Sequence, residues 1–144
     1  MSEISLIPAI DISSTGLDAE NRRMEVVANN VANAETTKGP DGNIFKRRQV
    51  IFAAKLAEAM EAGDDFEKLR GVEVQGITED QRPPRQVHRP GHPDADENGF
   101  VSLPNISPVE EMVDMMTASR AYEANLNAIK TAREMAARAL EIGK

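Results

Sequence analysis

Apolar residues recur every seven positions in the N-terminal part of the chain. The stripe consists of Ile10, Leu17, Met24 and Val31, with Val27 and Ala34 at an offset of three. Spacings of three, four and seven place side chains on one face of an α-helix that packs against a partner. The pattern therefore predicts a helix from about Leu6 to Ala34. Gly16 weakens its early part, and Thr15 with Asp18 resembles a local cap, so a break near Gly16 stays open.

A second helix is predicted at the C-terminal end. Ser107-Pro108-Val109-Glu110 combines a capping box with proline at the first helical position, and the chain then runs to Ile142 without glycine or proline. Its stripe steps by three and four through Met112, Met115, Ser119, Tyr122, Leu126, Ile129, Arg133, Ala136 and Leu140, and only Ser119 and Arg133 interrupt its apolar character. A parallel row of alanines, from Ala121 to Ala139, either admits a second close neighbour or reflects only the helix propensity of alanine.

The segment between the helices has a different pattern. Gly39-Pro40-Asp41-Gly42 predicts a turn. Alternation predicts a strand at 71–77, and apolar residues predict further strands at 44–54 and 100–104. Residues 56–69 fit a short helix or a mobile loop, and four prolines between Arg82 and Pro93 argue against regular structure there. The predicted fold is mainly α with a small β insertion. Residues 1–36 and 107–144 contain the two terminal helices, and 37–106 form a β- and loop-rich region between them.

Composition limits the size of the core and the class of partner. The chain of 144 residues has no cysteine or tryptophan and only five aromatic side chains, four Phe and one Tyr. Because few large aromatic side chains are available for burial, we expect a small hydrophobic core that is stabilised by contacts with neighbouring subunits. A net charge of −7 argues against nucleic-acid binding. No apolar run has the length of a membrane span, and the N-terminus lacks the pattern of a secretory signal peptide.

Candidate chemistry is sparse. His88 and His92, with Asp94 and Asp96, could form a metal site, but the prolines around them exclude a helical pair and favour a solvated loop. No serine or glycine pattern indicates a nucleophile or a phosphate loop. We therefore expect no enzyme, no metal and no cofactor. The basic run 46–48 fits either an acidic partner or a charged strand edge.

Three passages together resemble a known family. They are GLDAENRRMEVVANNVANAET (16–36), KGPDGNIFKRRQVIF (38–52) and GFVSLPNISPVEEMVDMMTASRAYEANLNAIKTA (99–132). The chain resembles the bacterial flagellar rod, hook and filament-type axial proteins over essentially its whole length, and is most similar to subunits of the proximal rod. The resemblance implies a structural subunit of the basal-body rod, exported by the flagellar type III system and polymerised helically into a hollow shaft across the periplasm. It also implies that the helices of 1–36 and 107–144 pack as an inner coiled-coil layer, with 37–106 as the outer region.

The resemblance also implies partners and contact residues. The expected partners are other rod subunits, further copies of the chain, and proteins on the export-gate and MS-ring side at the rod base. The residues expected to carry helix packing are Leu17, Met24, Val27, Asn30, Val31, Asn33, Met112, Met115, Met116, Tyr122, Leu126 and Ile129.

The asparagines at the end of the first helix have two interpretations. Asn29, Asn30 and Asn33 are poor helix formers, which fits a simple helix stop. With the resemblance added, Asn30 and Asn33 are expected to form a hydrogen-bonding node between this helix, the turn at 39–42 and neighbouring helices. Two other functions stay open. One is a soluble helical-hairpin adaptor that binds an amphipathic partner helix, and the other is a metal enzyme based on His88 and His92.

Overall fold

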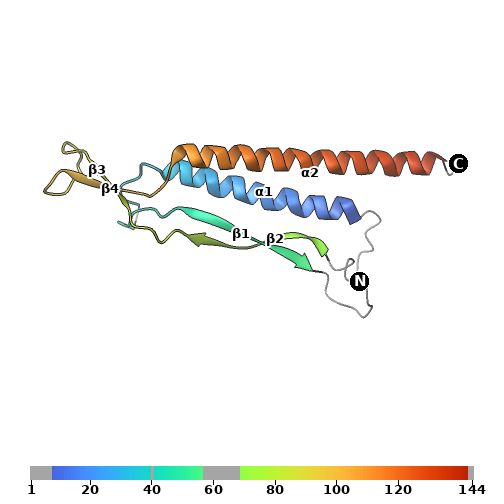
Figure 1. Ribbon diagram of the computed structural model, residues 1–144, viewed down its shortest axis with the longest axis horizontal. Coiled ribbons are helices and arrows are strands. Elements are labelled where there is room, and N and C mark those ends of the chain that lie inside the picture. The colour runs from blue at the N-terminus through green and yellow to red at the C-terminus, as the bar shows by residue number, and fades with distance from the viewer. Residues whose placement is uncertain (1–7, 40, 57–68, 143–144) are drawn as a thin grey trace.

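The computed structural model describes residues 8–39, 41–56 and 69–142. The elements are α1 (Pro8–Asn33), β1 (Arg48–Leu56), β2 (Leu69–Glu79), β3 (Arg85–His88), β4 (Phe100–Leu103) and α2 (Pro108–Ile142). The molecule is elongated, with α1 and α2 antiparallel along its length and the β1–β2 hairpin beside α1 (Figure 1). The predicted helix start at Leu6 and most of the predicted segment 56–69 lie outside the described residues.

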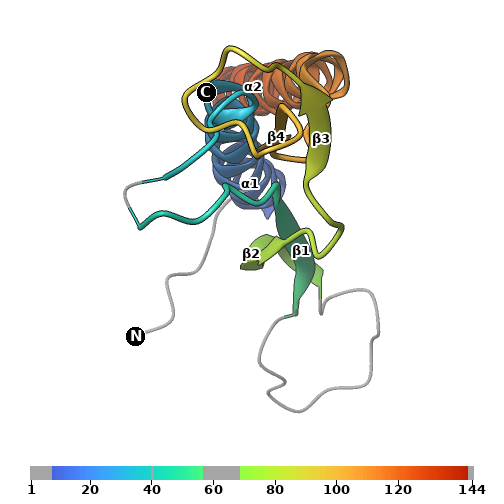
Figure 2. The same cartoon turned by 90° about the vertical axis from the view of Figure 1, so that its left-hand side faces the viewer.

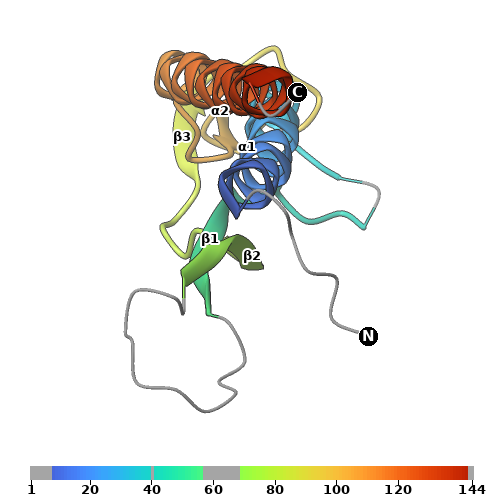
Figure 3. The ribbon, with the colours of Figure 1, turned by 90° about the vertical axis from the view of Figure 1, so that its right-hand side faces the viewer.

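The predicted fold class is wrong. Instead of a mainly α chain with coiled-coil packing, the described residues form two helices and four strands, paired in two separate two-stranded sheets. The physical reason is that α1 packs on two kinds of neighbour, with α2 on one side and the hairpin on the other (Figure 3). The sevenfold stripe is accordingly only half-buried at Ile10, Leu17, Met24 and Val31. The most buried positions of α1 are Ala19, Val26, Val27 and Asn30.

The helix boundaries follow the local sequence signals. The backbone N–H of Glu110 points at the Ser107 hydroxyl, 3.5 Å away, and the N–H of Glu111 donates to the Ser107 carbonyl at 3.1 Å. The first contact places the Ser107 side chain as the N-cap of α2, where it faces an N–H without an intrahelical partner, and the second is the first intrahelical hydrogen bond. α1 continues through Gly16 without the break that Thr15 and Asp18 left open.

The hairpin pairs β1 and β2 antiparallel, from Arg48 opposite Glu79 to Leu56 opposite Leu69. Its register shifts twice, between Ile51 and Phe52 and between Ala54 and Leu56. The smaller sheet pairs β3 with β4 and lies at the end of the helix pair (Figure 2). The expectation that 82–93 lacks regular structure is wrong for β3, because its prolines flank Arg85–His88 and leave those four residues free to pair.

The densest part of the core lies at this same end of the molecule. Val101 and Leu103 of β4 and the following Ile106 are almost fully buried, together with Ala34 just after α1 and Ala118 of α2. α1 and α2 are in extensive contact with each other. Neither α1 nor α2, the helices that the structure describes, is long and apolar enough to cross a membrane.

Candidate functional site

The side chain of Asn30 joins three distant parts of the chain. It is 1% exposed, and its Nδ2 donates to the Arg48 carbonyl and to Glu111 Oε2, each at 2.8 Å. Its Oδ1 accepts from the Arg48 N–H at 2.9 Å. The carboxamide therefore uses both amide protons and its oxygen. α1, β1 and α2 are connected at one buried point.

The position of Arg48 on β1 explains why a carboxamide fits there. The Asp80 N–H donates to the Arg47 carbonyl at 2.8 Å, so the peptide groups of Arg48 point away from β2 toward the open edge of the hairpin. Asn30 presents a donor and an acceptor to that edge as a neighbouring strand would. Backbone groups that would otherwise be buried without partners are thus satisfied.

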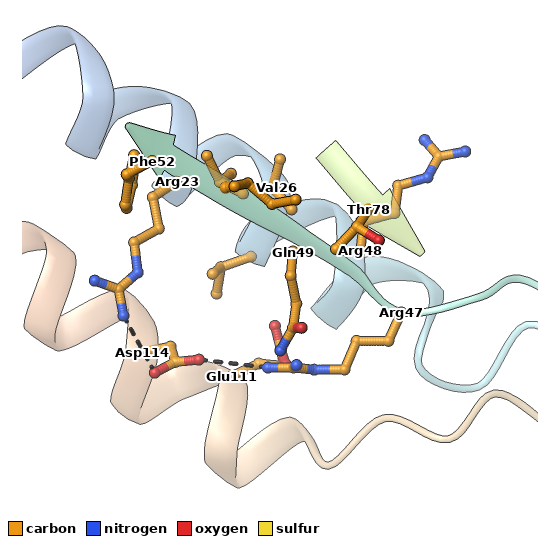
Figure 4. Close-up of a pocket in the computed structure, with 12 residues that line it drawn as sticks. Arg23, Val26, Arg47, Arg48, Gln49, Phe52, Thr78, Glu111 and Asp114 are labelled. Carbon is orange, nitrogen blue, oxygen red and sulfur yellow. Dashed lines mark hydrogen bonds and ion pairs between the residues drawn. The ribbon is translucent and has the colours of Figure 1, made fainter. Parts of the chain in front are cut away.

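Charged side chains extend this contact. Glu111 is fully buried, and its Oε1 accepts from Arg47 Nε at 2.5 Å. Asp114, one turn further along α2, lies 3.4 Å from Arg47 Nη2 and 3.5 Å from Arg23 Nη2 of α1 (Figure 4). We refer to Arg23, Asn30, Arg47, Arg48, Glu111 and Asp114 as the polar junction. Its ion pairs match two guanidinium groups with two carboxylates, so the buried charge of Glu111 is compensated.

A groove runs beside the polar junction, between β1 and the two helices. Its volume is about 410 Å³, and its walls combine Arg23, Arg47 and Asp114 with apolar side chains such as Val26 and Phe52 (Figure 4). The side chain of Gln49 extends from β1 toward Glu111 in the same view. The groove therefore gives solvent access to Arg23 and Asp114 at the rim of the junction, while Asn30 and Glu111 stay buried.

The structure distributes the sequence-predicted contact residues over three environments. Val27, Asn30 and Ile129 are buried. The half-buried residues are Leu17, Met24, Val31, Asn33, Met115 and Tyr122. Met112, Met116 and Leu126 are exposed. The predicted set thus includes both the internal helix contact and an outward surface.

Sequence does not connect Arg47 with Glu111. The basic run 46–48, which contains Arg47, fits a strand edge or a site for an acidic partner. In the structure the two residues pair with each other inside the molecule. Arg47 lies in a basic run and Glu111 follows Glu110 at the start of α2, but nothing in local spacing connects the two.

Asn33 lies close to Asn30 in sequence but takes no part in the polar junction. Its Nδ2 donates to the Asn29 carbonyl at 2.9 Å, and its Oδ1 accepts from the Thr36 hydroxyl at 3.3 Å. Asn33 therefore organises the end of α1. The partners of Asn30 are Arg48 and Glu111, and not the turn at 39–42.

An ion pair connects the loop after α1 with the loop between β3 and β4. Lys38 Nζ lies 2.7 Å from Asp94 Oδ1, and the Thr37 hydroxyl donates to Asp94 Oδ2 at 2.7 Å. These two contacts, first the one with Lys38 and then the one with Thr37, hold the pKa of Asp94 below its usual value. The contacts tie the two loops together at the end of the molecule.

The two histidines contact different residues. The His88 ring packs edge-on against Phe100 with ring centroids 5.1 Å apart. His92 Nδ1 accepts from the Asp94 N–H at 3.1 Å. Within the described residues, no group of three or more His, Asp or Glu side chains is arranged to hold a metal ion.

The outward side of α2 is apolar at its N-terminal end. Val109, Met112, Val113 and Met116 are 70%, 55%, 57% and 56% exposed. Their spacing of three and four puts them on one side of the helix, and α1 lies on another. We call these four residues the outer face of α2.

Comparison with known families matches both helices. "Flagella basal body rod protein" matches residues 10–40, and "Flagellar basal body rod FlgEFG protein C-terminal" matches residues 97–142. These ranges contain most of α1, β4 and all of α2, and so the helices that meet at the polar junction. The chain thus belongs to the class of flagellar rod proteins, which confirms the resemblance predicted from sequence.

Individual relatives identify the family within this class. Flagellar basal-body rod protein FlgC of Salmonella typhimurium is 38% identical over 141 residues, covering 98% of this chain and 100% of the relative. The FlgC proteins of Borreliella burgdorferi and Aquifex aeolicus are 39% and 41% identical, covering 96% and 98% of this chain and 98% and 99% of those relatives. The chain belongs to the FlgC family and is a structural subunit of the flagellar basal-body rod.

Proposed function

We propose that the chain assembles helically with other rod subunits and with further copies of itself through the exposed surfaces of α1 and α2. In this proposal the hairpin and the β3–β4 sheet lie outside the helices, and the chain acts without catalysis after export by the flagellar type III system. Proteins on the export-gate and MS-ring side are its proposed partners at the rod base.

The outer face of α2 is the observation that carries this proposal. Four large apolar side chains on adjacent turns are costly to leave in water, and such a patch is typical of a protein interface. Methionine supports an interface with several related neighbours, because its flexible thioether adapts to different surfaces. The contact is proposed to extend over six half-buried residues and one exposed residue: Leu17, Met24, Val31, Asn33, Met115 and Tyr122, with Leu126. Buried Val27, Asn30 and Ile129 support it from inside.

The rod subunit and the adaptor would use the outer face of α2 differently. A rod subunit contacts several neighbouring subunits, whereas an adaptor binds one partner. The adaptor alternative needs only one amphipathic helix, and the same outer face would bind it. Membership of the FlgC family favours the rod subunit, because a heterologous contact repeated between subunits produces a helical assembly.

The experiment places negative charge on the outer face of α2. A strain lacking the endogenous chain receives Met112→Glu/Met116→Glu, with Asn127→Glu, an exposed polar position on the same helix, as the control. We expect the double variant to fold normally but to abolish basal-body rods and swimming, because buried carboxylates would lack partners. The control is expected to swim. Normal rods in the double variant would exclude the outer face as an assembly surface.

A further inference from the structure

A second hydrogen bond connects α1 with the hairpin, far from the polar junction. The Thr15 hydroxyl accepts from the Val72 N–H of β2 at 3.0 Å, and it donates to the Ile12 carbonyl of its own helix at 2.7 Å. The hydroxyl is therefore used in both directions.

The adjoining glycine makes this contact possible. A Cβ on Gly71 would lie 2.1 Å from Thr15 Oγ1, far inside van der Waals contact. Gly71 also has a φ of 116°, in a region that side chains rarely adopt. The backbone of β2 approaches α1 closely at this point because residue 71 has no side chain.

The two contacts are matched in spacing. Thr15 and Asn30 are fifteen residues apart on α1, which corresponds to about 22 Å along a helix. Their partners are Val72, which pairs with Ala54, and Arg48, six residues before Ala54 on β1. Six strand residues span about 20 Å. Sliding the hairpin by one residue, about 3.3 Å, would therefore break both contacts together.

We propose that Thr15 is a positioning residue that acts with Asn30 to fix the alignment of the β1–β2 hairpin along α1. A two-stranded hairpin with two register shifts has little to define its own position. Thr15 and Asn30 of α1 fix the position of the hairpin by hydrogen bonds near its two ends. The alignment sets where the exposed hairpin side chains Ile51, Phe52 and Ile77 face neighbours in the rod. Only this last step rests on the proposed function.

Hydrogen exchange on the purified full-length chain tests the contact directly. Thr15→Val keeps the shape of the side chain but removes the hydroxyl, so the Val72 amide is expected to exchange about two- to ten-fold faster. Thr15→Ser restores the hydroxyl and is expected to restore protection. Ser14→Ala is the matched control, because among the described residues the Ser14 hydroxyl bonds to the Asp11 carbonyl of its own helix and not to the hairpin. Equal exchange in Thr15→Val and wild type, or a Val72 amide already unprotected in wild type, would overturn the proposal.

Swimming in the complemented deletion strain gives the second readout. Thr15→Val is expected to reduce the swimming zone, while Thr15→Ser and Ser14→Ala swim like wild type. Thr15→Ser behaving like Thr15→Val would show that the hydroxyl is not the determinant. A wild-type chain that fails to restore swimming would contradict the rod function and leave the exchange result standing, so the two failures are distinguishable.

Discussion

Asn30 shows why a residue with poor helix propensity occupies the last turns of α1. Its carboxamide makes three hydrogen bonds, two with the backbone of Arg48 and one with Glu111. Alanine or lysine would favour the helix by only a few tenths of a kcal/mol, which is less than the cost of leaving those buried partners unsatisfied. The tertiary contacts therefore outweigh local propensity.

Replacing Asn30 tests this at the residue scale. We expect Asn30→Leu to lower the free energy of unfolding by about 3 kcal/mol, because the Arg48 peptide groups and Glu111 lose their partner without regaining water. Asn33→Leu is the control and is expected to cost less than about 1 kcal/mol, since Asn33 is half-buried and bonds locally. Urea unfolding followed by circular dichroism measures both, and equal losses would remove the special role of Asn30.

Sequence could indicate that the asparagines matter but not which one. Asn29, Asn30 and Asn33 have the same chemistry, and only the packing of β1 and α2 buries Asn30 while leaving Asn29 exposed. The partners lie 18 and 81 residues away in sequence. No local pattern encodes contacts at those separations.

At the scale of elements, α2 was predicted closely in extent but less well in orientation. Capping by Ser107 and the absence of internal glycine or proline account for its bounds, Pro108–Ile142. The predicted apolar stripe, however, contains residues with different environments. Ile129 is 8% exposed, whereas Leu126, three positions earlier, is 36% exposed. Some residues of the stripe therefore face the interior of the molecule, whereas others are exposed to solvent.

This difference leads to a prediction for two charge substitutions on α2. Ile129→Asp is expected to destabilise the isolated chain by about 3–5 kcal/mol, because the carboxylate would be buried without a partner. Leu126→Asp is expected to cost less than about 1 kcal/mol in the isolated chain, yet to impair rod assembly. Thermal unfolding of both variants, with basal-body yield in cells, separates internal packing from contact with neighbours. Similar melting temperatures would contradict the assigned orientation of α2.

The strands were easier to predict than their placement. Alternation located β1, β2 and β4 to within a few residues, but a strand pattern does not say which helix covers the sheet. The hairpin lies along α1 because Asn30 and Thr15 bond to its backbone and Gly71 permits close approach. β3 was missed because its four residues stand among prolines. These tertiary causes explain why the fold class was wrong although most elements were expected.

At the scale of the whole molecule, the polar junction joins α1, β1 and α2, which lie far apart in the sequence. Arg47 and Glu111 are 64 residues apart, and Asn30 and Glu111 are 81 apart. A buried ion pair often adds little net stability, but breaking it leaves an uncompensated charge. The junction is therefore suited to specifying one arrangement of α1, β1 and α2 rather than to raising stability.

A double-mutant cycle on Arg47 and Glu111 tests that distinction. Arg47→Met leaves the fully buried Glu111 charged without its guanidinium and is expected to cost about 3–5 kcal/mol in unfolding free energy. Glu111→Leu should cost about 2 kcal/mol, because Asp114 remains to pair with Arg47. The double variant is expected to cost less than the sum by at least about 1.5 kcal/mol.

The exposed pair Arg22 and Glu25 is the matched control for this cycle. Its atoms lie 2.6 Å apart with both side chains about half exposed, so we expect a coupling below about 0.5 kcal/mol. If Arg47 and Glu111 couple no more strongly than this surface pair, the junction cannot define the arrangement of the three segments. Strong coupling would mean that either single change disfavours the one packing in which α1, β1 and α2 are correctly placed. Rod assembly should then be lost in each single variant and recovered, at least partly, in the double variant.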